Sequence, residues 1–158
     1  MMDLFGNLLL GLGISLSPGN LMLCFGGVLI GTLIGVLPGI GPTATVAMLL
    51  PLTFYLPPVG ALIMLAGIFY GSQYGGSATA ILVNLPGESS SVVTCLDGHQ
   101  MARQGKAGTA LSIAAVGSLF AGTVGTLLIM LFAPALTKMA LQFGPAEYCA
   151  LMALGVLL

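Results

Sequence analysis

The sequence NLMLCFGGVLIGTLIGVLPGIGP, residues 20–42, contains the pattern that decides the fold. Residues 20–37 are apolar and uncharged, and they nearly reach the roughly 20 residues that a helix needs to cross a bilayer. Gly27, Gly31 and Gly35 recur at four-residue spacing, which removes side chains from one face and lets a second helix approach closely. We therefore predict a transmembrane helix that packs tightly against a neighbour.

The composition of the whole chain points to the same class. Of its residues, 58% are hydrophobic and 4% are charged, with a mean hydropathy of +1.14, whereas soluble domains carry about 25% charged residues. No charged residue lies between Asp3 and Glu88, so this run is long enough for three or four membrane passages. We predict an all-α polytopic integral membrane protein, with one membrane domain over residues 1–158. Its transmembrane helices include Pro/Gly-broken, discontinuous helices or re-entrant hairpins.

The sequence gives little support for a site that binds nucleic acid, a metal or a cofactor. A net charge of −1 gives no reason to expect nucleic acid. The three cysteines, Cys24, Cys95 and Cys149, show no CxxC spacing, and His99 is the single histidine. We therefore expect no metal site and no cofactor, and we expect the cysteines to pack as apolar side chains.

Proline and glycine divide the rest of the chain. The helix over 20–37 must end at residues 38–42, because proline lacks an N–H donor and glycine permits positive φ. The further segments that we expect are an apolar partial helix at 4–16, an apolar segment at 43–56 interrupted by Pro51, one span at 59–85 interrupted at the polar residues 71–77, a hydrophilic stretch at 86–109, a clean span at 110–132, a loop at 134–145, and an apolar segment from Tyr148.

Two expectations concern topology and length. Arg103 and Lys106 outnumber Lys138 on the other side of the span over 110–132, which favours a cytoplasmic position for residues 86–109. The segment that begins at Tyr148 reaches only about half a span before Leu158, so we expect a fragment of a longer protein.

A repeated Leu-Pro-Gly turn carries most of the functional information. Residues 36–39 and 84–87 each end an apolar segment, and small hydroxyl residues follow each turn. Because Ser and Thr are good N-caps, each turn should lead into a new helix N-terminus. Such termini offer N–H donors and partial positive charge, and transporters direct them at substrate carboxylates.

We therefore predict that an anionic substrate binds at these turns, although the pattern equally allows turns that only connect helices at the surface. The candidate substrate-binding residues are Pro38, Gly39, Gly41, Thr43, Thr45, Asn84, Pro86, Gly87, Glu88, Ser89, Ser90 and Ser91. A second segment, Tyr74, Gly75, Gly76 and Ser77, either forms a path for substrate or cation or allows a tight helix crossing. Asn84 either contacts substrate or only caps its turn.

Three motifs resemble a known family over essentially the whole chain. GVLPGIGP (35–42), YGSQYGGS (70–77) and NLPGESSSVVTCLDGH (84–99) are similar to the large membrane subunit, TctA, of the tripartite tricarboxylate transporter family. Members of that family are much longer, with a related second half. The resemblance is therefore to their N-terminal half.

The resemblance implies a multi-pass permease of the bacterial inner membrane that is not an enzyme. It also implies uptake of citrate-like tricarboxylates or related carboxylates, driven by a gradient of Na⁺ or H⁺. The partners it implies are a small membrane subunit, a periplasmic solute-binding protein and the lipid bilayer. Two alternatives are a non-transporting assembly or scaffold subunit, and an intramembrane serine protease. The protease would need a Ser facing His99, which lies in the hydrophilic stretch.

Overall fold

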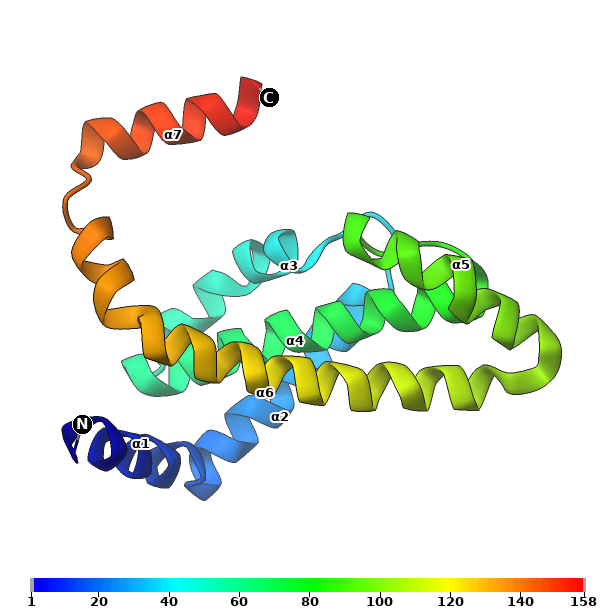
Figure 1. Cartoon of the computed structure of the whole chain (residues 1–158), viewed down its shortest axis with the longest axis horizontal. Helices are drawn as coiled ribbons and strands as arrows, with labels where there is room; N and C mark the ends of the chain where they lie inside the picture. Colours follow the sequence, from blue (N-terminus) through cyan, green and yellow to red (C-terminus); the bar gives the residue numbers. More distant parts are fainter. Residues whose placement is uncertain (1, 158) are drawn as a thin grey trace. The chain divides into compact units, whose positions relative to one another are not determined.

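The computed structural model describes residues 2–157, and within that range it contains helices and turns but no strand (Figure 1). It divides into two compact units, of which the first ends at Ala115 and the second begins at Val116, inside helix α6. The α-helices are α1 (Met2–Ser15), α2 (Pro18–Gly35), α3 (Pro42–Leu49), α4 (Pro58–Val83), α5 (Val92–Met101), α6 (Ala107–Ala140) and α7 (Pro145–Leu157). Two 3₁₀-helices, η1 (Leu50–Tyr55) and η2 (Ser89–Ser91), and one π-helix, η3 (Ala102–Lys106), join them.

The first unit is organised by close packing of α2 against α4. Gly27, Gly31 and Gly35 are buried, and a Cβ added to each would lie less than 3.0 Å from a backbone atom of α4. The α4 residues that they meet are Met64, Ile68 and Ser72, in the same order along the chain. The two helices therefore run parallel, and the predicted close approach of a second helix is confirmed.

Glycines of α4 complete this contact from the other side. Gly67, Gly71 and Gly75 lie against backbone atoms of Cys24, Val28 and Thr32, respectively. Each helix thus presents glycines to the backbone of the other, and no side chain separates the two main chains at these points. Backbones can approach this closely only where small residues line both faces.

The predicted interruption of the second span at residues 71–77 is wrong. Helix α4 is continuous over 26 residues, from Pro58 to Val83. Glycine costs helix stability where it is exposed, but Gly71 and Gly75 are buried against α2, so packing compensates for their low propensity. The buried Thr79 hydroxyl donates to the Gly75 carbonyl at 2.8 Å, so it needs no break in the helix.

Between the parallel helices, the chain must return to the end at which α2 began. Residues 42–55 make this return as α3 followed by η1, and Pro51 lies at the start of the 3₁₀ segment. The predicted hydroxyl N-cap is wrong here, because Gly41 is the N-cap residue of α3 and Pro42 takes the first helical position. Proline suits that position, since its missing N–H would have no partner there.

Helix α5 packs against the last turns of α4. The His99 Nδ1 atom lies 3.0 Å from the Ile81 carbonyl oxygen. A Cβ on Gly98 would lie 2.8 Å from the Ile81 side chain. Segment η3 then forms a kink between α5 and α6, because Gly105 leaves the helical conformation at φ +78°, a left-handed conformation that glycine adopts without strain.

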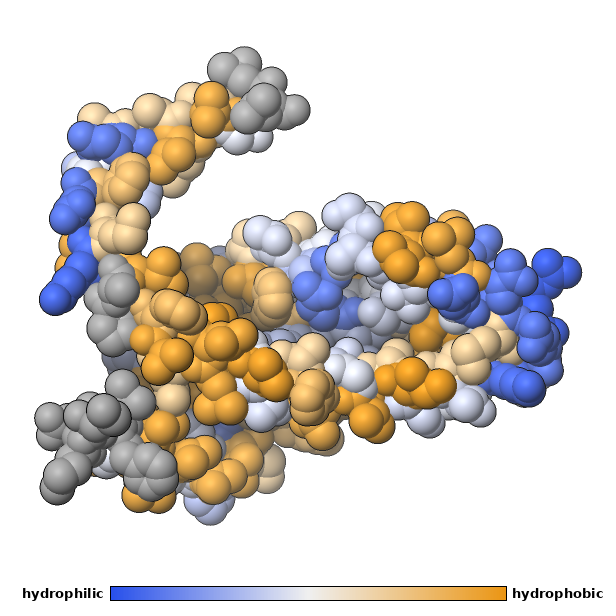
Figure 2. Space-filling model, viewed as in Figure 1, coloured by the Kyte–Doolittle hydropathy of each residue, from blue (hydrophilic) through white to orange (hydrophobic). Residues whose placement is uncertain are grey.

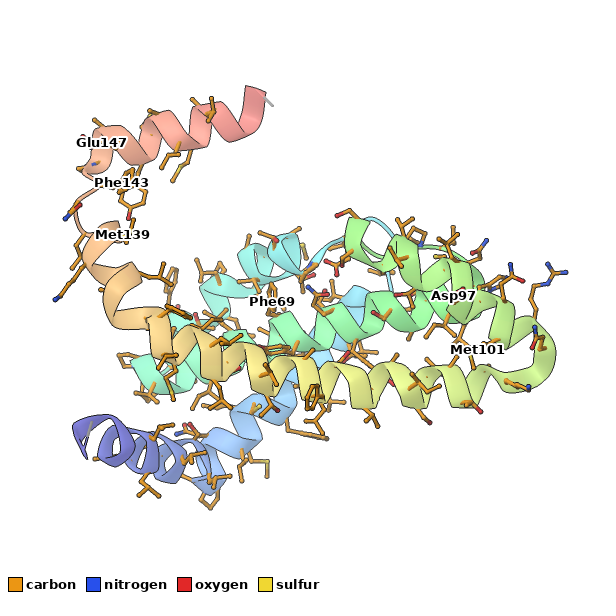
Figure 3. All side chains as sticks on the ribbon, viewed as in Figure 1. Phe69, Asp97, Met101, Met139, Phe143 and Glu147 are labelled. Carbon is orange, nitrogen blue, oxygen red and sulfur yellow. The ribbon has the colours of Figure 1, made fainter. Side chains whose placement is uncertain are left out.

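In the second unit, helix α6 ends later than the sequence predicted. The predicted loop over 134–145 is wrong, because α6 continues to Ala140 and only residues 141–144 lie between it and α7. The helix can continue through a proline because the proline removes only one hydrogen bond. A loop in an apolar environment would instead leave many backbone groups unpaired. Phe143 and Glu147 lie at this connection (Figure 3), where the Tyr148 hydroxyl donates to the Ala140 carbonyl at 3.1 Å.

The surface of the described residues is largely apolar. Figure 2 shows apolar side chains along the outer faces of the helices, and most large hydrophobic residues are exposed. Among the described residues, two stretches are long and apolar enough to cross a membrane: Pro18–Gly35, and Ser89–Ala133, which runs through the kink at Gly105 into α6.

Candidate functional site

The first Leu-Pro-Gly turn follows the end of α2 at Gly35. The Leu37 N–H donates to the Ile34 carbonyl at 2.9 Å, and Gly39 then reverses the chain at φ +88°. Because a side chain at that φ would be strained, the turn requires glycine there. Gly41 is extended, with φ −69° and ψ 166°, and directs the chain into α3.

The second turn follows the end of α4. Asn84 is the C-cap residue and adopts the left-handed conformation, with φ 61° and ψ 29°. This conformation ends the helix, and asparagine tolerates it better than most residues with side chains. Residues 85–88 then lead to η2 and α5, with Glu88 extended at φ −148° and ψ 171°.

Glycine contacts bring the two turns to the same place. The second turn folds back so that Gly87 lies on Gly76 of α4, and a Cβ on Gly87 would come 2.5 Å from the Gly76 Cα atom. That Cβ would also lie 3.2 Å from the carbonyl oxygen of Gly35, the last residue of α2. A Cβ on Gly41 would lie 3.9 Å from the Glu88 Cβ atom. Glu88 therefore reaches the N-terminus of α3.

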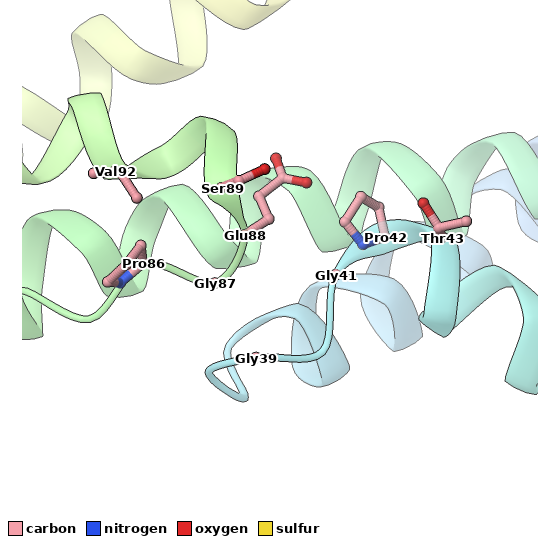
Figure 4. Close-up of a pocket in the computed structure, with 9 residues that line it drawn as sticks. All are labelled: Gly39, Gly41, Pro42, Thr43, Pro86, Gly87, Glu88, Ser89 and Val92. Carbon is pink, nitrogen blue, oxygen red and sulfur yellow. The ribbon is translucent and has the colours of Figure 1, made fainter. Parts of the chain in front are cut away.

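One open pocket lies between the turns, with a volume of about 520 Å³. Figure 4 shows the Glu88 side chain between the second turn and the start of α3. Pockets that hold small molecules commonly enclose 300–1,000 Å³. The residues that line this pocket are Gly39, Gly41, Pro42, Thr43, Pro86, Gly87, Glu88, Ser89 and Val92.

The pocket offers donors from two helix starts. In α3 the first backbone bond runs from the Thr45 N–H to the Gly41 carbonyl at 3.0 Å. In η2 it runs from the Ser91 N–H to the Glu88 carbonyl at 3.2 Å. The N–H groups of the lining residues Thr43 and Ser89 precede these bonds and have no partner within their helices. The Thr43 and Ser89 hydroxyls are exposed beside them, so the pocket combines backbone and side-chain donors suited to an anion.

Two of the predicted hydroxyl groups are occupied inside the protein. Thr45 is fully buried, and its Oγ1 donates to the Gly41 carbonyl at 3.1 Å and lies 3.2 Å from the Ser72 hydroxyl. Ser91 is 3% exposed, accepts from the Glu88 N–H at 3.1 Å and donates to the Glu88 carbonyl at 2.9 Å. These two hydroxyls hold the turns in shape and do not line the pocket.

Three other predicted residues do not line the pocket. Ser90 is exposed, and its hydroxyl donates to the Glu88 carboxylate. Pro38 and Asn84 are exposed and belong to the turns without lining the pocket. Substrate contact by any of these residues stays a prediction.

The glycines at 75 and 76 support the turns from beneath. Gly75 packs against the end of α2, and Gly76 against Gly87. Tyr74 and Ser77 are half-buried, and none of the four residues lines the pocket. The arrangement matches a tight helix crossing, and a path for substrate or cation stays a prediction.

Two lining residues were not among the predicted ones. Pro42 follows Gly41 directly, and the preference of proline for the first position of a helix could have indicated it. Val92 begins α5, and no sequence signal distinguishes it from the other exposed valines.

Comparison with known proteins agrees with the expected family. The model of the tripartite tricarboxylate transporter TctA family matches residues 21–158. An Agrobacterium vitis protein, described as "Uncharacterized 52.8 kDa protein in TAR-I ttuC' 3'region", is 65% identical over 157 residues, covering 99% of this chain. The chain spans 31% of the length of that relative. No solved structure matches the chain.

Proposed function

Because the chain belongs to the tripartite tricarboxylate transporter TctA family, we propose that it forms part of a permease for citrate-like tricarboxylates or related carboxylates. The permease is a secondary transporter driven by an ion gradient, and it spans the bacterial inner membrane several times. It receives its substrate from a periplasmic solute-binding protein and works with a small membrane subunit. The breaks after α2 and α4 form the turns of discontinuous helices or re-entrant hairpins.

The observation that supports this proposal is the meeting of two turns from distant parts of the chain at one pocket. Each turn begins a helix, and each contributes N–H donors and an exposed hydroxyl, from Thr43 and Ser89 respectively. A substrate with several carboxylates can engage both starts at once. Transporters use half-helix N-termini in this way because they attract anions without burying a basic side chain.

A scaffold subunit would need the glycine contacts between α2 and α4 but not this pocket. A scaffold subunit and a carboxylate carrier should therefore respond differently when a negative charge is introduced into the pocket. Replacing Thr43 with Asp keeps a good residue for the first turn of a helix but places a negative charge among the donors. A scaffold would tolerate the change, whereas a carboxylate carrier would lose its substrate.

The test is uptake of radiolabelled citrate by cells that express the complete transporter. We expect Thr43→Asp to abolish uptake while the protein still reaches the membrane in normal amount. Thr109→Asp is the matched control, because Thr109 is exposed in the hydrophilic stretch and does not line the pocket. Normal uptake by Thr43→Asp, or no carboxylate uptake by the unaltered transporter, would overturn the proposal.

A further inference from the structure

The single ionisable side chain of the pocket is an acid, which is unexpected for a site that receives anions. Of the nine lining residues, Glu88 alone carries an ionisable side chain. Its carboxylate and a substrate carboxylate would repel each other across the same small space. Two like charges about 5 Å apart at a protein surface weaken binding on the order of 100-fold.

We propose that Glu88 is the coupling group of the transporter, and that it binds one monovalent cation, H⁺ or Na⁺, together with the substrate. This inference rests on the proposed function. The cation neutralises Glu88, and the donors of both turns then hold the substrate carboxylates. Substrate and cation each bind well only when the other is present, which is the requirement for coupled transport.

The position of Glu88 supports this role. It is half-buried at the base of the second turn, and its Cβ atom lies beside Gly41 of the first turn. The Ser90 hydroxyl and the Ser91 N–H both donate to the Glu88 carboxylate, and the Ser91 hydroxyl accepts from the Glu88 N–H and donates to the Glu88 carbonyl. The carboxylate is thus fixed where it contacts whatever occupies the pocket.

Neighbouring titratable groups do not share this position. On the helices packed against the second turn they are Tyr70 and Tyr74 on α4, and Cys95, Asp97 and His99 on α5. None of them lines the pocket, and the His99 ring bonds to the Ile81 carbonyl instead. Asp97 is exposed on α5 (Figure 3) and provides a matched acidic control.

The experiment measures citrate binding and uptake by membrane vesicles that contain the complete transporter. Citrate affinity is compared with and without Na⁺ at fixed pH, and then across pH in Na⁺-free buffer. The unaltered protein should gain about 100-fold in affinity from one of the two cations. Glu88→Gln should bind tightly without that cation, lose its dependence on it, and no longer concentrate citrate. Because citrate itself titrates, the variant is measured over the same pH range as the unaltered protein.

The controls separate this inference from the proposed function. Asp97→Asn should retain both cation dependence and concentrative uptake. Should Glu88→Gln fail to insert, Glu88→Asp and Ser90→Ala should each change the half-saturating cation concentration several-fold, and no change in either overturns the inference. Wild-type cation dependence in Glu88→Gln overturns the coupling role alone, whereas an unaltered protein that binds no carboxylate overturns the proposed function.

Discussion

Ser89 and Ser91 are two residues apart, but Ser89 is exposed in the pocket and Ser91 is buried. Ser89 is exposed in the pocket, so Ser89→Ala should remove a donor to the substrate carboxylate. A hydrogen bond to a charged group contributes about 1.5–3 kcal/mol, which corresponds to a roughly 10- to 150-fold loss of affinity. Ser91 is buried and bonds twice to the Glu88 backbone, so Ser91→Ala should reduce the stability of the fold by about 1–2 kcal/mol.

The assay pairs citrate binding by calorimetry with thermal unfolding, both on the detergent-solubilised complete transporter. Ser89→Ala should change affinity with little change in melting temperature, and Ser91→Ala should do the reverse. Ser89→Asp sharpens the contrast, because it adds a charge that should abolish binding yet suits the start of a helix. If Ser89→Asp folds normally and binds citrate as well as the unaltered protein does, the carboxylate site lies elsewhere.

Three further predictions test the fold and its placement. Gly31→Ala should lower stability by about 1–3 kcal/mol in thermal unfolding, because its Cβ would collide with the Ile68 backbone, whereas Gly26→Ala, with open space around it, should not. A cysteine at Gln104, in a protein without its native cysteines, should resist impermeant maleimide in whole cells; ready labelling would place residues 86–109 outside. The chain should stay in the membrane fraction after alkaline carbonate washing, and folded monomer in detergent-free buffer would contradict its membrane character.

Patterns of small and apolar residues predicted the helical class and the tight crossing. The spacing of Gly27, Gly31 and Gly35 was enough to indicate a close partner, because few other reasons favour glycine every four residues in an apolar helix. The pattern could not identify the partner. That information lies in the complementary glycines of α4, whose polar neighbours made residues 71–77 look like a break.

The two turns were visible in the sequence, but their meeting was not. A Leu-Pro-Gly turn ends a helix for local reasons, whereas its position depends on the parallel register of α2 and α4 and on the contact of Gly87 with Gly76. The hydroxyl groups likewise could not be sorted locally. Thr43 and Thr45 are alike in sequence, yet the helix turns one to the surface and the other into the core.

If both turns bind one carboxylate substrate, that substrate should protect engineered cysteines at both turns. Thr43→Cys and Ser89→Cys are placed separately in the complete transporter, in a background without Cys24, Cys95 and Cys149. Citrate should slow maleimide labelling at both positions with the same half-maximal concentration, while sulfate at equal ionic strength should not. Protection at one position only, or at neither, would contradict a shared site between the turns.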